Sequence, residues 1–295
     1  MTDAEVRHLT ISLLTQETDR DRQTRVGASN LSDPCDRSLA YAMAGESNRS
    51  AAIDRYWLGR VIGSAMGGLW EDRAIREPNL TPEKHVWFGD IAGYGKVGGS
   101  IDLLVEDEDH LIDYKGTTRA DIAILEDLLQ AWGLHRVGEK PRWEHMARGN
   151  WKLTIKTDVV MSLSDAKYKK AMEKMEFKLN RYRGQLSLYM LSGAASRASI
   201  VFFARDGNAG FDNPALDGYE NPNRKHDIFV FSFNLDREFA EGLLTRAGDI
   251  WAKLQAGAKP KDFEAHDLCF ECELARENEE RDAIVAAFEG VEATA

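Results

Sequence analysis

The chain has 295 residues, of which 43% are hydrophobic and 29% are charged, so it has the composition of a folded globular protein. A net charge of −11 and only three cysteines exclude a disulfide framework and a surface that coats nucleic acid throughout. Any contact with nucleic acid is therefore expected to be local. The first residues lack the pattern of a signal peptide, and no run reaches the roughly 18 uncharged apolar residues of a membrane span. A cytoplasmic protein without a membrane partner is expected.

In chain order, helical stretches surround a group of short strands. The N-terminal segment predicts one amphipathic helix and a charged connector, and a strand meander with an acidic turn follows two further helical stretches. Helices are predicted over 36–47, 51–77, 119–135, 164–192 and 235–256, an irregular basic segment over 136–157, and two strands over 197–205 and 226–233. Helices before, between and after a meander indicate a mixed α/β domain.

Two acids and a lysine stand out in the meander. Asp102 falls in one predicted strand, and Asp113 and Lys115 fall in the next, with Tyr114 between them. Because side chains alternate along a strand, residues 113 and 115 share a face, and the tight turn makes the two strands antiparallel neighbours. Carboxylates suit Mg²⁺ or Mn²⁺, and a nearby lysine stabilises charge on a phosphate. The alternative is a solvated surface ion pair.

This segment resembles the PD-(D/E)xK nuclease core, in which an Asp on one strand precedes (Asp/Glu)-x-Lys on the next. The sequence GQLSLYM at 184–190 resembles the Gln-xxx-Tyr motif of the RecB-like exonuclease branch, with Gln185 and Tyr189 on one helix face. The resemblance implies a restriction-endonuclease-like α/β core with a central mixed β-sheet flanked by helices. It assigns catalytic roles to the acids, the lysine, Gln185 and Tyr189. The alternative for the last two is an ordinary core helix.

A glycine-containing helix resembles the one that usually presents Gly-xxx-His in these nucleases. Here Gly63 is followed at the histidine position by Gly67, so the usual histidine ligand is absent. Glu71 lies one helical turn further on and faces the same side. The predicted metal-binding set is therefore Glu71, Asp102, Asp113 and Tyr114. The alternative for Glu71 is a solvated helix acid.

The cysteines resemble those of the iron–sulfur branch of RecB-like nucleases, which includes CRISPR-adaptation nucleases and the AddB nuclease domain. In that branch one cysteine precedes the core and three follow it. Here Cys35 precedes it, Cys269 and Cys272 follow it, and the expected last cysteine is missing. His266 is the predicted substitute. The resemblance favours an iron–sulfur (4Fe–4S) cluster, three thiolates and an imidazole also suit a structural Zn²⁺, and free buried cysteines stay open as the third alternative.

Basic residues gather in two segments that precede Gln185. The first holds Arg136, Lys140, Arg142, Arg148, Lys152 and Lys156, interleaved with Trp143 and Trp151; the second holds Lys167, Lys169, Lys170, Lys174, Lys178, Arg181 and Arg183. Basic and aromatic residues together track a nucleic-acid backbone and stack on unpaired bases. The alternative is a charged helix face beside an insertion with its own small core.

We therefore expect a metal-dependent DNA exonuclease that acts on single-stranded DNA or DNA ends in recombination, repair or phage replication. The alternatives are a weakly active DNA-binding or assembly subunit and a structure-specific endonuclease. No helicase motif is present, so a helicase, annealing protein or other recombination partner is expected. The predicted organisation is an N-terminal helix and connector over 1–26, a nuclease domain over 27–275 with an insertion around 119–160, and an acidic tail over 276–295.

Overall fold

The computed structural model describes residues 26–46, 68, 71–133, 143–146, 150–155, 158–204, 228–273 and 276. For 143–146, 150–155, 158–162 and residue 228 it describes the backbone alone. Several predictions fall outside the described residues: the N-terminal helix, the departure at Gly63 and Gly67, and nearly all of the acidic tail. In the described part of the chain no helix is long and apolar enough to cross a membrane.

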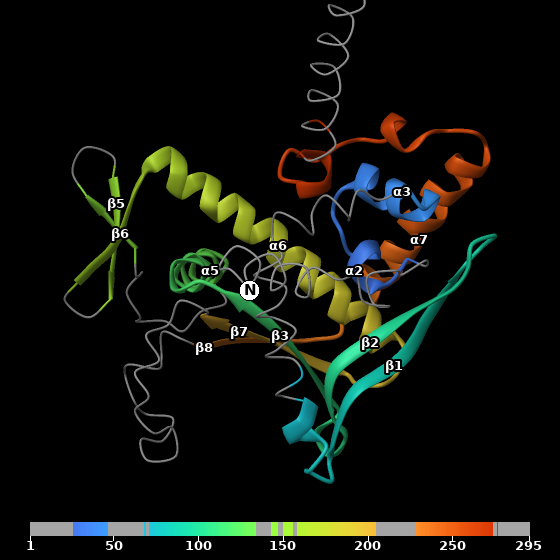
Figure 1. Cartoon of the computed structure of the whole chain (residues 1–295), viewed down its shortest axis with the longest axis horizontal. Helices are drawn as coiled ribbons and strands as arrows, with labels where there is room; N and C mark the ends of the chain where they lie inside the picture. The colour runs from blue at the N-terminus through green and yellow to red at the C-terminus, as the bar shows by residue number, and fades with distance from the viewer. Residues whose placement is uncertain are drawn as a thin grey trace, which may run out of the picture.

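The main sheet has five strands in the order β1-β2-β3-β7-β8. They are β1 Leu80–Ile91, β2 Gly95–Val105, β3 His110–Thr117, β7 Arg197–Ala204 and β8 Ile228–Asn234. The pair β3 and β7 is parallel, and the other neighbours are antiparallel. A parallel neighbour needs a crossover connection, and the chain between β3 and β7 supplies it through two helices (Figure 1).

Five helices accompany the sheet in the described residues: α2 Ala28–Leu31, α3 Asp36–Ala44, α5 Arg119–Ala131, α6 Asp165–Leu191 and α7 Arg237–Gln255. The long α6 crosses the molecule diagonally, with α5 beside its first half and α2, α3 and α7 beyond its second half (Figure 1). The buried cluster includes Ile101 and Leu111 from the sheet, Leu125 from α5 and Leu186 from α6. The predicted α/β class, a central mixed sheet flanked by helices, is confirmed.

Local signals fix where the helices begin and end. The Thr118 side chain accepts a hydrogen bond from the Asp121 N–H at 3.1 Å and caps α5. Asp236 caps α7 by accepting from the Phe239 N–H at 3.0 Å. Helix α3 ends at Gly45, whose φ of 74° is in the left-handed region that glycine adopts freely. Buried within the helical layer, the Tyr168 hydroxyl donates to Asp127 at 2.8 Å and joins α6 to α5.

A second sheet replaces the irregular segment predicted over 136–157. Its strands, in the order β4-β5-β6, are β4 Trp143–Met146, β5 Asn150–Ile155 and β6 Asp158–Ser164. The prediction was wrong because the many basic residues hide a period-two pattern. Trp151, Leu153 and Ile155 alternate with polar residues, as strand residues do. Helix α5 belongs to the main core, since Ile122 is fully buried there. The boundaries of the insertion stay a prediction.

Candidate active site and cysteine centre

The strands β2 and β3 bring the two acids and the lysine together. The 3₁₀ turn Glu106–Glu108 and Asp109, whose φ of 49° is left-handed, join the strands in the register Leu103 opposite Ile112. One step along, Asp102 reaches across and its Oδ2 accepts a hydrogen bond from the Tyr114 N–H at 3.0 Å. The Lys115 Nζ lies 2.7 Å from Asp113 Oδ2. Tyr114 therefore positions Asp102 through its main chain.

Burial dominates the electrostatics of this group. Asp113 is only 1% exposed, and burial raises its pKa to about 7, with Asp102 adding to the rise and Lys115 opposing it. Burial alone would lower the pKa of Lys115, but the charges of Asp113 and Asp102 outweigh it and raise that pKa. Without a metal, the pair Asp102 and Asp113 thus readily binds a proton, while Lys115 stays positively charged.

Helix α6 covers this group with aromatic and amide side chains. The Lys115 Nζ lies 5.1 Å from the centroid of the Tyr182 ring, within range of a cation–π contact. One turn further along α6, the Gln185 Nε2 donates to the Tyr189 hydroxyl at 3.3 Å. Burial raises the pKa of Tyr189 to about 12, so this hydroxyl keeps its proton at neutral pH. Side chains from residues 182–189 of α6 thus cover the site.

Tyr189 approaches β2 closely because Gly99 has no side chain. A Cβ at Gly99 would lie 2.9 Å from Tyr189 Cε1 and 3.0 Å from its hydroxyl oxygen. The Phe88 ring of β1 lies 6.0 Å from the Tyr189 ring, edge to face. The glycine therefore sets the position of Tyr189 against the sheet.

Glu71 stays a prediction as a metal ligand. It lies in the described helical turn 71–74 and is half-buried. Among the described residues, only Cys35, Cys269 and Cys272 form a group of three ligating side chains whose ligand atoms all lie within 4.8 Å of one another. Glu71 thus completes no such group with Asp102 and Asp113 here.

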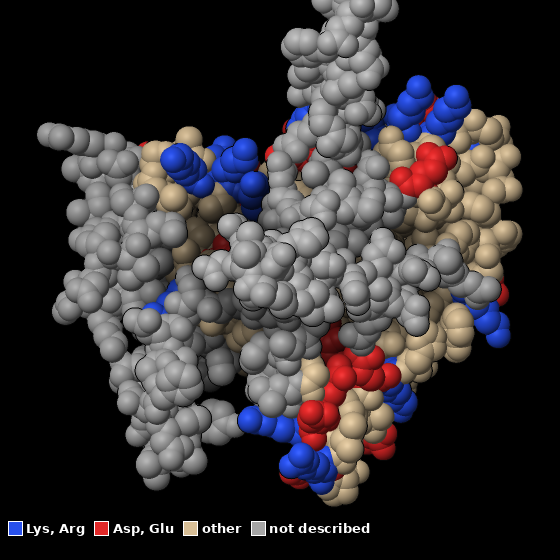
Figure 2. All heavy atoms as spheres, in the orientation of Figure 1, with Lys and Arg blue, Asp and Glu red and all other residues tan. Residues whose placement is uncertain are grey.

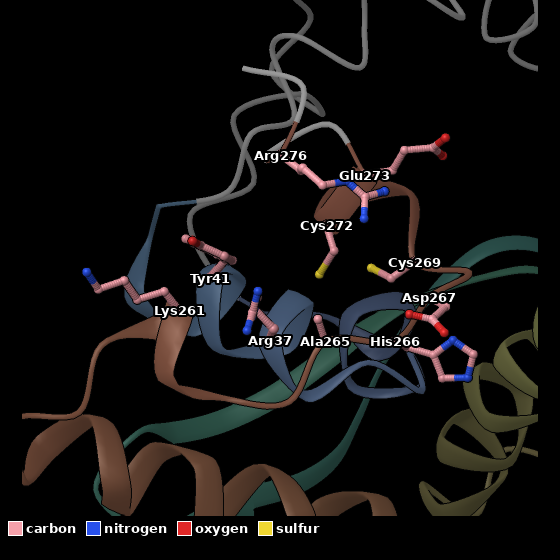
Figure 3. Close-up of a pocket in the computed structure, with 10 residues that line it drawn as sticks. All are labelled: Arg37, Tyr41, Lys261, Ala265, His266, Asp267, Cys269, Cys272, Glu273 and Arg276. Carbon is pink, nitrogen blue, oxygen red and sulfur yellow. The ribbon is translucent and has the colours of Figure 1, made fainter. Parts of the chain in front are cut away.

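The cysteine centre joins the two ends of the described chain. The Cys35 Sγ lies 3.5 Å from the Cys272 Sγ, and Cys269 completes the group. Figure 3 shows the sulfurs of Cys269 and Cys272 turned toward each other, on a segment that lies over α3. Hydrogen bonds from Cys269 and Cys272, together with the His266 N–H, lower the pKa of Cys35 to about 2. The pKa values of Cys269 and Cys272 are raised instead, so Cys35 is the thiol of the centre that most readily becomes a thiolate, the form that binds metal.

His266 does not occupy the predicted fourth ligand position. Its main-chain N–H donates to the Cys35 Sγ at 3.3 Å, but its ring packs on Phe177 with centroids 4.6 Å apart. Its Nδ1 accepts from the Leu268 N–H at 3.1 Å. The ring therefore points away from the sulfurs (Figure 3), because a local turn and an aromatic contact hold it elsewhere.

The second basic segment divides into outward and inward residues along α6. The lysines at 167, 169, 170, 174 and 178 are exposed, and Figure 2 shows Lys and Arg gathered over the first half of this helix. Arg181 instead donates to the Ser29 carbonyl at 3.2 Å, and Arg183 lies over the rings of Phe233 and Phe239. These two arginines make contacts within the fold, and their part in binding DNA stays a prediction. The side chains of the first basic segment lie outside the described residues.

Two residues beside the sites were missed by sequence reasoning. Buried Asp33 accepts hydrogen bonds from the Cys35 N–H at 3.0 Å and the Ser38 hydroxyl at 3.2 Å, and its Oδ2 lies 3.5 Å from Arg181. The Asp33-Pro34 dipeptide was the available signal for a turn of this kind. Tyr182, which faces Lys115, stands three residues before Gln185 and so on the same helix face.

No family model matches the sequence, and no curated protein matches it. Three solved structures are similar in chain course. The protein SSO0001 covers 83% of this chain and 86% of its own, with a TM-score of 0.45 and 13% identity. The second is LHK-Exo, an alkaline exonuclease from Laribacter hongkongensis whose structure was solved with dAMP. Its similarity covers 80% of this chain and 90% of LHK-Exo, with a TM-score of 0.39 and 17% identity. A phage-related exonuclease from Haemophilus somnus 129PT covers 79% and 95%, with a TM-score of 0.35 and 15% identity.

Proposed function

We propose that this chain is a metal-dependent deoxyribonuclease, an exonuclease that hydrolyses phosphodiester bonds of single-stranded DNA or of DNA ends. The observation that carries the proposal is the convergence of Asp102, Asp113 and Lys115 on adjacent strands, with Lys115 charged 2.7 Å from a buried carboxylate. A solvated surface pair, the alternative from sequence, does not fit a carboxyl that is 1% exposed.

The acids fit a hard divalent cation. Asp113 Oδ1 is buried and has no hydrogen-bond partner in the described part of the chain, an arrangement that is costly without a compensating group. Asp102 Oδ2 accepts from the Tyr114 N–H, which holds this carboxylate beside the carboxyl of Asp113. Mg²⁺ or Mn²⁺ held by these two carboxylates would neutralise phosphate charge and lower the pKa of a bound water.

The other side chains act directly on the substrate and its surroundings. Lys115 places a permanent positive charge where negative charge grows on the attacked phosphate. Tyr182 limits the directions open to the Lys115 ammonium by covering it. Gln185 fixes the Tyr189 hydroxyl, which stays protonated and is able to donate to a phosphate oxygen.

The exposed lysines of α6 supply a path for the DNA backbone. Lys167, Lys170, Lys174 and Lys178 follow one another at spacings of three and four, so they share one side of the helix. Tyr182 is the next residue in this series, and it contacts Lys115. A backbone that follows the lysines is thus led to the acids.

Cleavage assays test the proposal and separate it from its alternatives. Wild type with Mg²⁺ or Mn²⁺ should shorten end-labelled linear DNA and leave covalently closed circles intact. Lys115→Ala should lose cleavage, whereas Lys253→Ala, which removes an exposed lysine of α7, should not. Cleavage of closed circles would indicate the structure-specific endonuclease instead. DNA binding with no metal-dependent cleavage would indicate the assembly subunit and overturn the proposal.

The cysteine centre is proposed as a structural metal site that closes the chain. With Zn–S bonds of about 2.3 Å, tetrahedral geometry places the sulfurs about 3.8 Å apart. The 3.5 Å between Cys35 and Cys272 is close to that spacing. The spacing therefore favours a single Zn²⁺, and iron and sulfide in the purified protein would identify an iron–sulfur cluster instead.

A further inference from the structure

An exposed tryptophan stands on the edge strand of the main sheet. Trp87 of β1 is 53% exposed. In the described part of the chain it is one of three large apolar side chains that are more than half exposed, with Ile75 and Val230. An aromatic side chain buries about 150–250 Å² when it is fully packed. The position of Trp87 therefore calls for a reason.

The indole ring is held in place from two sides. Trp87 pairs with Gly98 of β2, and a Cβ at Gly98 would lie 2.8 Å from Trp87 Cε3. The ring thus lies over bare backbone, where any other residue would push it away. The His85 ring meets it edge-on, with centroids 4.9 Å apart and an interplanar angle of 80°. Two supports fix the ring before any ligand binds.

The register of β1 and β2 places this ring a few strand residues from Asp102. Opposite residues of an antiparallel pair share a face, and side chains alternate along each strand. Trp87 opposite Gly98 and His85 opposite Ser100 therefore lie on one face of the hairpin. Four residues of strand separate Gly98 from Asp102, about 13 Å, a distance that a few nucleotides of DNA span.

We propose that Trp87 is a stacking platform for an unpaired nucleobase, a few nucleotides from the phosphate that is cleaved. The proposal rests on the proposed nuclease function and names its substrate class as single-stranded DNA. An indole face stacks on any base, and the stacking is open only to a base that has left its own duplex. A fixed ring also loses little freedom on binding. The platform would then select unpaired DNA without reading its sequence.

Binding to fluorescent oligonucleotides, followed by anisotropy without added divalent metal, tests the platform independently of cleavage. The probes are a single-stranded oligonucleotide, its duplex, and an abasic strand with the same number of phosphates. Trp87→Ala should weaken binding of the single strand about tenfold, and Trp87→Phe should restore most of it. Duplex and abasic strands should bind Trp87→Ala and wild type within about twofold of each other, because neither offers an unpaired base.

Val230→Ala is the matched control, since it removes an apolar side chain of similar exposure from β8, and it should bind the single strand as wild type does. Equal loss of affinity for normal and abasic strands in Trp87→Ala would overturn the platform, as would no loss at all. If base-dependent binding is found but wild type cleaves no DNA with Mg²⁺ or Mn²⁺, the platform stands and the nuclease proposal fails. If wild type cleaves and Trp87→Ala binds unchanged, the platform alone fails.

Discussion

The carboxylate site and the cysteine centre are built in opposite ways. Asp102, Asp113 and Lys115 come from one strand–turn–strand unit, and the register of β2 and β3 fixes their relative positions. The cysteines come from both ends of the described chain, with Cys35 and Cys272 separated by 237 positions. Local pairing therefore assembles the first group, whereas the second forms only when α3 and the segment after α7 meet. We expect the first to govern chemistry and the second to govern stability.

The largest expected effect tests whether the carboxylate site governs chemistry. Asp113→Ala and Asp102→Ala remove metal ligands, and Lys115→Ala removes the positive charge beside the phosphate. Each should lower the cleavage rate by more than about 100-fold, with zinc or iron content unchanged. Rates on end-labelled DNA and metal analysis of each purified variant check this. A loss of bound zinc or iron in these variants would show that the two sites depend on each other.

The variant Cys35→Ser tests whether the cysteine centre governs stability. Without the thiolate the centre should lose its metal, and the free energy that metal binding adds to folding is lost with it. We expect lower zinc or iron content and a melting temperature reduced by several degrees. His266→Ala should keep the metal, because its ring faces Phe177. Full metal content in Cys35→Ser, or loss of metal in His266→Ala, would contradict this arrangement.

A smaller change disturbs only the α6 side chains that cover the active site. In Gly99→Val the new side chain would collide with Tyr189 and push the hydroxyl away from Gln185. Cleavage should fall about tenfold, the scale for a misplaced hydrogen-bond donor, while the metal content of the cysteine centre stays at the wild-type value. Rates and metal analysis on the same preparation measure both. An unchanged rate would mean that Tyr189 is only a core residue.

The smallest expected effect is a pH dependence confined to the carboxylates. Burial raises the pKa of Asp113 to about 7, so below that pH a divalent cation must displace a proton. Between pH 6 and pH 8 the charged fraction rises about tenfold, and the metal concentration for half-maximal cleavage should fall by a similar factor. Titrations of Mg²⁺ at both pH values measure it. A half-maximal concentration that rises with pH would contradict the assignment.

The sequence predicts the elements whose pattern is local. The meander, α6, α7 and the strands β7 and β8 follow period-two or helical spacing, and the turn between β2 and β3 already implies that Asp102 and Asp113 are neighbours. The second sheet was not predicted, because basic residues mask its alternation. The inward turn of Arg181 and Arg183 depends on which helices pack on α6, and spacing within one helix carries no such information.

The residues of the candidate sites also divide into those that a local sequence pattern predicts and those that only the fold positions. Asp102, Asp113 and Lys115 converge as strand periodicity predicts, but the position of the His266 ring depends on Phe177, which is far away in the sequence. Tyr182 and Trp87 were not singled out, because a tyrosine in a helix and a tryptophan in a strand are ordinary residues there. Their meaning comes from Lys115 and Gly98, which the fold places beside them.

The separation of the cysteines also has a consequence for biosynthesis. Cys35 leaves the ribosome early, and its partner at 272 follows 237 positions later, a delay of roughly 12 to 47 seconds at about 5–20 residues per second. The two catalytic strands are complete long before that. A truncated product that stops short of Cys269 carries every proposed catalytic residue yet lacks two of the three thiols of the centre. Closure of the centre thus requires that translation has passed Cys272.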